Sequence, residues 1–190
     1  HEWLLQRGKR YGPDHELGTW LNVYAGSTIY AGHLARVHGL SEPVKTRAIA
    51  PTGTIGIIAE TTTGIEPIYC VAYKRRFLDD NQKWVFQYVV APPAKRLMDK
   101  GIEPRLIEDA YSLALDIERR VAFQAWVQQY VDHGISSTLN LPYVITDPQE
   151  AEEFGDMLLK YLPNLRGITA YPDGARGGQP LSVVPLEIAL

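Results

Sequence analysis

The chain contains very little of what marks several large classes of protein. Cys70 is the only cysteine among 190 residues, so the chain can form neither an internal disulfide nor a cysteine-based zinc site. The longest apolar run, residues 48–59, is interrupted by Pro51, Gly53 and Gly56, and it falls short of the ~20 residues that cross a membrane. The five histidines show neither HxH nor HExxH spacing, and we therefore predict no metal site.

Positive charge is also scarce. A net charge of −3 and a pI near 6.0 give no reason to expect a nucleic-acid partner, because binding to a phosphate backbone requires clustered Lys and Arg. The one basic run, Lys74-Arg-Arg76, is typical of a solvated strand or loop end. The chain begins His-Glu-Trp, with neither a Met nor a secretory signal. We expect a cytoplasmic protein without a membrane partner, whose recorded sequence begins inside a longer gene.

What is present is a globular composition, 45% hydrophobic and 22% charged, with helical periodicity at the start of the chain. Residues 16–24 and 28–38 carry apolar side chains at helical spacing, which makes residues 1–47 a helical lead-in. The short apolar residues 48–50 predict a buried strand, and residues 55–60 predict the start of a helix. We treat the whole chain as one unit.

The second part mixes strand and helix signals. Residues 69–73 and 83–90 are rich in Val, Tyr, Trp and Phe on either side of Asp79-Asp-Asn81, which predicts a hairpin. Apolar residues at three- and four-residue spacing predict one long helix over residues 107–131.

The last part predicts a strand, a helix and a strand. Residues 136–141 read as a short strand, and Thr146 is the expected cap of a helix that has Pro148 in its first turn and ends near Tyr161. Residues 167–171 are the expected last strand. This order favours parallel pairing in an α/β architecture.

The segment Pro51-Thr-Gly-Thr-Ile-Gly56 has the composition of an anion-binding turn. A strand that feeds a helix through Thr and Gly presents backbone N–H groups and hydroxyls at the positive end of the helix. Gly53 would let the backbone approach an anion closely. No Lys follows, so this is not the GxxxxGK[ST] loop that binds ATP. The residues alone leave open that the segment is an ordinary turn.

Other candidate positions also have two interpretations. Glu66 follows three threonines and a glycine, and it is either an acid/base or ligand-binding group, or a carboxylate that fixes backbone amides. Ser136, Thr138 and Asn140 share one side of a predicted strand, which either lines a cavity or faces solvent. Cys70 is expected to be a small buried side chain.

Five segments, in this order, resemble the large subunit of ribonucleotide reductase, and the resemblance is closest to the adenosylcobalamin-dependent (class II) branch. They are Ala50-Pro-Thr-Gly-Thr-Ile-Gly56, Gly64-Ile-Glu-Pro67, Ala72-Tyr-Lys-Arg75, Gly134-Ile-Ser-Ser-Thr-Leu-Asn-Leu-Pro142 and Tyr171-Pro-Asp-Gly-Ala-Arg176. The resemblance implies an α/β fold that is the C-terminal portion of a ten-stranded barrel. Residues 48–190 would supply the phosphate loop and the later strands and helices.

The resemblance also implies site residues and a partner. In that family the Pro-Thr-Gly-Thr loop holds the phosphates of the ribonucleotide substrate, so Pro51, Thr52, Gly53, Thr54 and Ile55 are the expected substrate-phosphate-binding residues. The family converts ribonucleotides to deoxyribonucleotides by thiyl-radical chemistry that needs at least three cysteines and an Asn-x-Cys-x-Glu segment. This chain has neither, so we assign no catalytic residue. An N-terminal half of the barrel would have to supply those residues.

The branch is inferred from one position. Reductases with a separate radical-generating subunit carry two adjacent relay tyrosines where this chain has Tyr171-Pro172, and proline cannot carry a relay radical. Adenosylcobalamin is therefore the implied cofactor of the whole enzyme, which can form a homodimer. Whether the substrate is a diphosphate or a triphosphate stays open. The alternative is a non-catalytic nucleotide-phosphate-binding or structural remnant of the barrel.

Overall fold

A computed structural model describes residues 1–172 and 181–190. The helices are α1 (Glu2–Leu5), α2 (His15–Ala25), α3 (Ser27–Val37), α4 (Gly53–Ile58), α5 (Pro92–Asp99), α6 (Ala110–Ala114), α7 (Ile117–Gln128), α8 (Pro148–Tyr161) and α9 (Leu186–Ala189), with 3-10 turns η1 (Pro104–Leu106) and η2 (Leu162–Asn164). The strands are β1 (Ala72–Leu78), β2 (Trp84–Val90), β3 (Thr138–Leu141), β4 (Thr169–Pro172) and β5 (Leu181–Val183). The residues from Asp173 to Arg176, which end the last of the five segments, lie outside the described residues.

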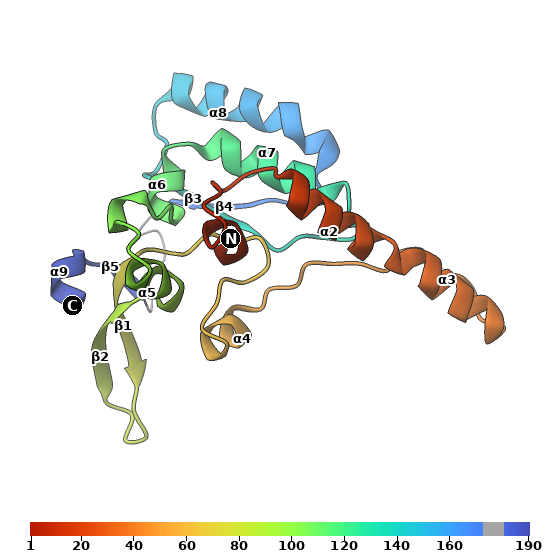
Figure 1. Cartoon of the computed structure of the whole chain (residues 1–190). Helices are drawn as coiled ribbons and strands as arrows, with labels where there is room; N and C mark the ends of the chain where they lie inside the picture. Colours follow the sequence, from red (N-terminus) through yellow and green to blue (C-terminus); the bar gives the residue numbers. More distant parts are fainter. Residues whose placement is uncertain (173–180) are drawn as a thin grey trace.

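A parallel pair of strands carries the α/β part of the fold. β3 and β4 pair in parallel, from Thr138 opposite Thr169 to Leu141 opposite Pro172. The connection between them contains α8, and Figure 1 shows α7 and α8 on the same side of the pair. The expected α/β class and the parallel pairing are therefore confirmed, although the described strands do not close into a barrel.

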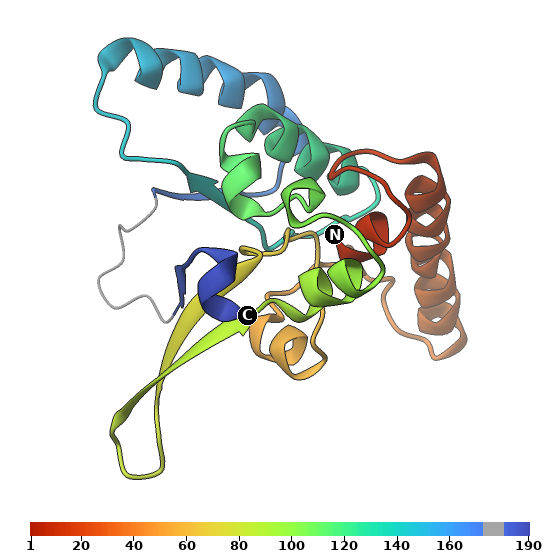
Figure 2. The ribbon, with the colours of Figure 1, turned by 60° about the vertical axis from the view of Figure 1, so that its left-hand side comes forward.

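A second sheet is antiparallel, with strand order β2-β1-β5. β1 and β2 form the expected hairpin, with Ala72 opposite Val90 and Leu78 opposite Trp84, although the first strand begins and ends later than the expected residues 69–73. Figure 2 shows the hairpin projecting away from the rest of the molecule. The strand expected over residues 167–171 is present as β4, but the expectation that it is the last strand is wrong, because β5 follows it.

The single long helix expected over residues 107–131 is two helices. α6 ends at Ala114, and Asp116 caps α7 by accepting a hydrogen bond from the Arg119 N–H. An Asp at this position competes for backbone N–H groups and starts a new helix, although the apolar spacing continues across it. Ile107 packs in a different apolar cluster, with Ile68 and Leu97.

Two further expectations need correction. The cap of α8 is Asp147 and not Thr146: its carboxylate accepts hydrogen bonds from the Gln149 and Glu150 N–H groups, while Pro148 occupies the first helical position. Residues 48–50 do not form a buried strand. They make one parallel bridge, Ile49 with Ile135, and Ala48 and Ala50 are exposed because no second neighbour covers them in the described part of the chain.

The main core lies between α1, α6 and α7. Its buried side chains include Leu4, Tyr11, Leu113 and Phe123. The ring of Tyr11 meets that of Phe123 edge-on with centroids 4.6 Å apart, and its hydroxyl donates to the Ile65 carbonyl at 2.7 Å. This bond ties the loop after α4 to the core. No helix in the described ranges is long and apolar enough to span a membrane.

Candidate functional site

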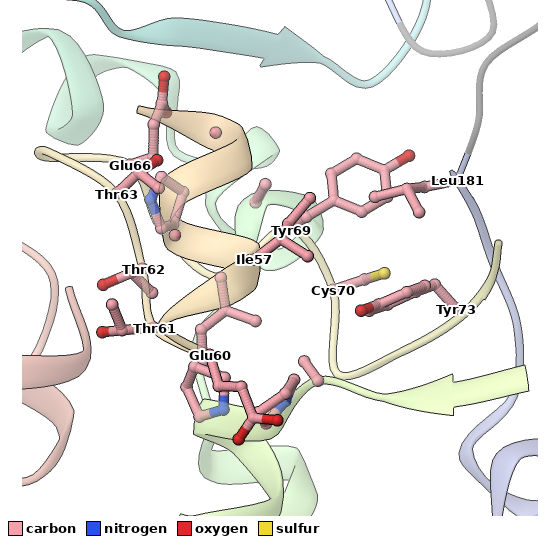
Figure 3. Close-up of a pocket in the computed structure, with 18 of the residues that line it drawn as sticks. Ile57, Glu60, Thr61, Thr62, Thr63, Glu66, Tyr69, Cys70, Tyr73 and Leu181 are labelled. Carbon is pink, nitrogen blue, oxygen red and sulfur yellow. The ribbon is translucent and has the colours of Figure 1, made fainter. Parts of the chain in front are cut away.

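A cavity of about 570 Å³ lies where α4, the loop after it, the base of the hairpin, α5 and β3 meet (Figure 3). In the view of Figure 3, Thr61 and Thr62 lie on one side of Ile57 and Tyr73 lies on the other. The cavity is lined by both polar and apolar side chains. The polar and sulfur-containing members are Glu60, Thr61, Thr62, Thr63, Glu66, Tyr69, Cys70, Tyr73, Arg75, Thr138 and Asn140.

Two glycines of α4 line this cavity, and they have different roles. A Cβ built on Gly56 would lie 2.0 Å from Cγ2 of Thr63, so Gly56 is needed for the close packing of α4 against its own loop. A Cβ on Gly53 would meet no atom within 4 Å in the described part of the chain. The packing of this chain therefore does not require a glycine at position 53.

The N-terminus of α4 is open. Thr52 is the N-cap residue, and among the described residues no side chain caps the helix. The Gly56 N–H donates to the Thr52 carbonyl at 2.8 Å, which leaves the preceding N–H groups of the first turn without helical partners, as at any helix start. Of the five residues implied as phosphate-binding, Gly53 lines the cavity. Pro51, Thr52, Thr54 and Ile55 lie outside the lining, and Ile55 is 65% exposed.

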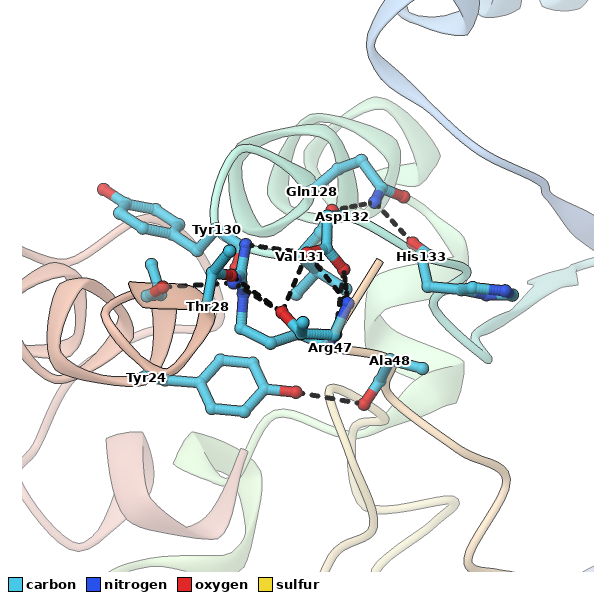
Figure 4. A network of polar contacts seen from close by, with 11 residues as sticks. Tyr24, Thr28, Arg47, Ala48, Gln128, Tyr130, Val131, Asp132 and His133 are labelled. Atoms are coloured by element: carbon cyan, nitrogen blue, oxygen red, sulfur yellow. Dashed lines mark hydrogen bonds and ion pairs between the residues drawn. The ribbon is translucent and has the colours of Figure 1, made fainter. Parts of the chain in front are cut away.

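Residues 46–48, which precede the α4 segment, are anchored to the turn after α7 by the network in Figure 4. Asp132 accepts hydrogen bonds from the Thr46 and Arg47 N–H groups, at 2.8 to 3.1 Å, and forms an ion pair with Arg47 at 3.2 Å. Burial alone would raise the pKa of Asp132, but these bonds and the Arg47 charge outweigh it and lower the pKa. Tyr24 adds a hydrogen bond to the Ala48 carbonyl at 3.2 Å.

The chain after α4 has a second anchor. The Glu2 carboxylate accepts hydrogen bonds from Arg96 of α5, at 2.8 and 2.9 Å, and from the Thr61 hydroxyl at 2.6 Å. Arg96 also donates to the Glu60 carbonyl. Burial would raise the pKa of Glu2, but the bonds from Thr61 and Arg96 lower it, so the carboxylate stays charged and holds the loop. The α4 segment therefore takes its position from both flanks.

The wall opposite α4 is built around a fully buried arginine. Arg120 of α7 donates to Glu66 at 3.0 Å, to the Thr138 carbonyl at 2.6 Å and to Oδ1 of Asn140 at 3.3 Å. Glu66 also accepts the Thr138 N–H at 2.7 Å. Burial raises the pKa of Glu66, while Arg120 and the Thr138 N–H oppose the rise. The sequence left two interpretations of Glu66 open, an acid/base or ligand-binding group and a carboxylate that fixes a backbone amide. Its hydrogen bond with the Thr138 N–H is the contact expected of the second.

Some of the remaining candidate residues line the cavity and others do not. Thr138 and Asn140 line the cavity, as one interpretation of their strand predicts, whereas Ser136 is not among the lining residues. Cys70 is 1% exposed and lines the cavity, in agreement with the expected burial. Across residues 1–172 and 181–190, no three His, Cys, Asp or Glu side chains form a group that could hold a metal ion.

Sequence reasoning missed Arg120, although a signal was present. Arg120, Gln124 and Gln128 recur every four residues on α7, and all three are at least 90% buried. Gln124 donates to the Gly167 carbonyl at 2.8 Å, and Gln128 donates to the Val131 and His133 carbonyls at 2.6 and 2.8 Å. Polar residues at such spacing on an apolar face indicate buried side chains that bond the main chain.

Comparisons with known proteins agree on one family. Residues 35–171 match the family model described as "Ribonucleotide reductase, barrel domain". A vitamin B12-dependent ribonucleoside-diphosphate reductase of Mycobacterium tuberculosis is 31% identical over 154 residues, covering 71% of this chain and 22% of that protein. The protein of the same name from Thermoplasma acidophilum is 28% identical over 160 residues, covering 75% of this chain and 20% of that protein.

A solved structure shows the same fold. The crystal structure of a B12-dependent (class II) ribonucleotide reductase superposes with a TM-score of 0.71 at 17% sequence identity. The match covers 99% of this chain and 31% of that one. The chain spans about a fifth of the length of the curated relatives described above.

Proposed function

Because the chain belongs to the ribonucleotide reductase barrel family, we propose that it supplies the substrate-phosphate-binding segment of a reductase that converts ribonucleotides to deoxyribonucleotides. The segment is Pro51 to Ile55, with the phosphates at the N-terminus of α4. The observation that carries the proposal is Gly53. It opens α4, lies at the cavity, and has free space where a side chain would stand.

This geometry suits an anion for a physical reason. The first-turn N–H groups of a helix carry partial positive charge, and a group with two or three acceptor oxygens can satisfy several of them at once. Among the described residues no side chain caps α4 by accepting a hydrogen bond from these N–H groups. A glycine at the first helical position lets a phosphate approach the main chain more closely than a side chain would allow.

The cofactor belongs to the whole enzyme in this proposal. The relatives are named vitamin B12-dependent, and adenosylcobalamin would supply the radical. A cavity of about 570 Å³ suits a molecule of drug size, and a corrin with its nucleotide tail is several times heavier. The described residues therefore do not form a cobalamin site by themselves.

The partner in this proposal is the rest of the barrel. One cysteine, Cys70, cannot provide both a thiyl radical and a reducing pair, so the chemistry requires residues from outside this chain. The test is to combine the chain with an N-terminal barrel portion of the family and to measure cobalamin-dependent formation of deoxyribonucleotides. Product formation that requires both parts supports the proposal. If nucleotide binds but no product ever forms, the non-catalytic remnant is the better description.

The phosphate segment has its own test, the substitution Gly53→Val. The open space at this position predicts that the variant folds normally, while its side chain blocks the approach of a phosphate. We expect pyrophosphate affinity, measured by calorimetry, to fall at least tenfold with an unchanged melting temperature. The matched control is Gly155→Val on α8, where a Cβ also meets no atom within 4 Å of the described structure and which lies outside the cavity lining. Equal affinities of the two variants would refute the assignment.

A further inference from the structure

The amide of Asn140 has a fixed orientation. Its Oδ1 accepts a hydrogen bond from Nη1 of Arg120 at 3.3 Å. A guanidinium can only donate, so the atom of Asn140 that faces it must be the oxygen. The two ends of an amide are chemically opposite, and the Nδ2 donors are therefore turned away from Arg120. Asn140 lines the cavity, and among the described residues Nδ2 has no hydrogen-bond partner.

Arg120 is itself held in place, so this orientation is rigid. Its side chain is fully buried, and its Nη2 donates both to Glu66 and to the Thr138 carbonyl. Glu66 is fixed in turn by the Thr138 N–H. A planar guanidinium bound on this many sides cannot rotate to follow its neighbour. Both oxygens of the Glu66 carboxylate already accept hydrogen bonds, from Arg120 and from the Thr138 N–H. Glu66 is therefore not a partner for Nδ2 of Asn140, which can donate to a ligand in the cavity.

We propose that Asn140 is a specificity-determining residue that donates a hydrogen bond to an acceptor atom on the nucleoside part of the substrate, and that Arg120 is the positioning residue that orients it. The inference rests on the proposed function, since Gly53 and Asn140 line the same cavity. With the phosphates at α4, the nucleoside extends toward β3. A cavity whose fixed polar group is a donor selects ligands that present an acceptor there.

The decisive variant is Asn140→Asp. Aspartate still accepts a hydrogen bond from Arg120, but it turns an acceptor toward the cavity in place of a donor. We expect the affinity of the chain for a ribonucleoside diphosphate, measured by calorimetry, to fall about tenfold. Affinity for pyrophosphate, which lacks a nucleoside, should stay within about twofold. Asn164→Asp makes the same exchange at an exposed position outside the cavity and should change neither affinity.

Two more variants separate orientation from folding. Asn140→Ala removes the donor without adding a charge, and it should lower nucleoside diphosphate affinity even if Asn140→Asp folds poorly. Arg120→Lys keeps a cation near Glu66 but loses the planar fork, so the amide is free to turn and affinity should fall about threefold. In an Asn140→Ala background the Arg120→Lys change should have no further effect on affinity. A purely structural role of Arg120 would instead lower affinity in both backgrounds, and for pyrophosphate as well.

The outcomes distinguish this inference from the function on which it rests. If Gly53→Val weakens the nucleoside diphosphate while Asn140→Asp and Asn140→Ala both leave it within twofold, the Asn140 inference is wrong and the phosphate segment stands. If the unaltered chain binds neither pyrophosphate nor the nucleotide, the proposed function fails and the inference fails with it. Selective loss of the nucleotide in the Asn140 variants supports both.

Discussion

The two walls of the cavity are built in opposite ways. On one side α4 is short and exposed, with Ile55, Ile57 and Ile58 all more than 60% accessible. On the other side Arg120 is almost completely buried and is joined by hydrogen bonds to Thr138 and Asn140, which line the cavity. The difference indicates that the position of α4 comes from its flanking anchors, whereas the opposite wall is held by its own packing. Substitutions should therefore affect stability very differently on the two sides.

The largest loss of stability is expected from Arg120→Met. It removes the cation that Glu66 faces and leaves the Thr138 carbonyl without its side-chain donor. Removing one member of a buried pair costs about 3–5 kcal/mol, because the partner remains buried without compensation. The measurement is urea unfolding, with Arg105→Met on the 81%-exposed Arg105 as the control. A loss below about 1 kcal/mol would mean that this wall is not the rigid one.

On the α4 side, Gly56→Ala should cost about 1–3 kcal/mol, because its Cβ would overlap Thr63 and lie 3.2 Å from the Thr61 carbonyl. Gly53→Ala, three residues earlier in the same helix, provides the matched comparison. With open space at position 53, it should leave stability unchanged or raise it by up to about 1 kcal/mol. Thermal melts of the two variants measure the difference, and equal effects would contradict the distinct roles of the two glycines.

The anchor before α4 should depend on pH. The pKa of Asp132 lies below its usual 3.8, so its charge favours the folded state. This contribution is fully present above the unfolded pKa and is lost as the pH falls through the lower, folded pKa. Asp132→Asn should therefore cost about 1 kcal/mol at pH 7, and less as the pH drops below about 3.8. Chemical unfolding across this range tests the sign, and a difference that grows in acid would contradict it.

The smallest effect on stability is expected from Ile58→Lys. Ile58 is 78% exposed, and substitutions at such positions usually change stability by less than about 0.5 kcal/mol. The same variant should weaken assembly with the rest of the barrel if that part covers α4. Analytical ultracentrifugation of the mixture measures this, and Ile29→Lys on the 78%-exposed Ile29 of α3 is the control. Since exposed apolar faces associate, we also expect the unaltered chain to oligomerise in isolation.

The sequence predicted the elements whose signals are local. The hairpin, α2, α3 and the parallel pairing of β3 with β4 follow from turn residues, periodicity and element order. The prediction of one long helix over residues 107–131 was wrong because a single side chain, that of Asp116, starts a new helix although the apolar periodicity continues across it. For the site, composition and the family resemblance together predict the segment of residues 51–55, and of these five residues Gly53 lines the cavity. Glu66, Thr138 and Asn140 were candidates from the sequence, but Arg120, which bonds all three, was missed because only the packing of α7 on β3 brings it to them.

The buried polar side chains of α7 restrict the register in which this helix packs on its neighbours. Arg120 and Gln124 donate to the Thr138 and Gly167 carbonyls, and Gln128 accepts a hydrogen bond from the Arg166 N–H, at successive levels about 6 Å apart along the helix. An apolar face tolerates a small slide, because one methyl group replaces another. These polar contacts do not, since a shift by one residue would break all three of these hydrogen bonds in the interior at once. The register between α7 and the chain beneath it is therefore set in discrete steps, by hydrogen bonding.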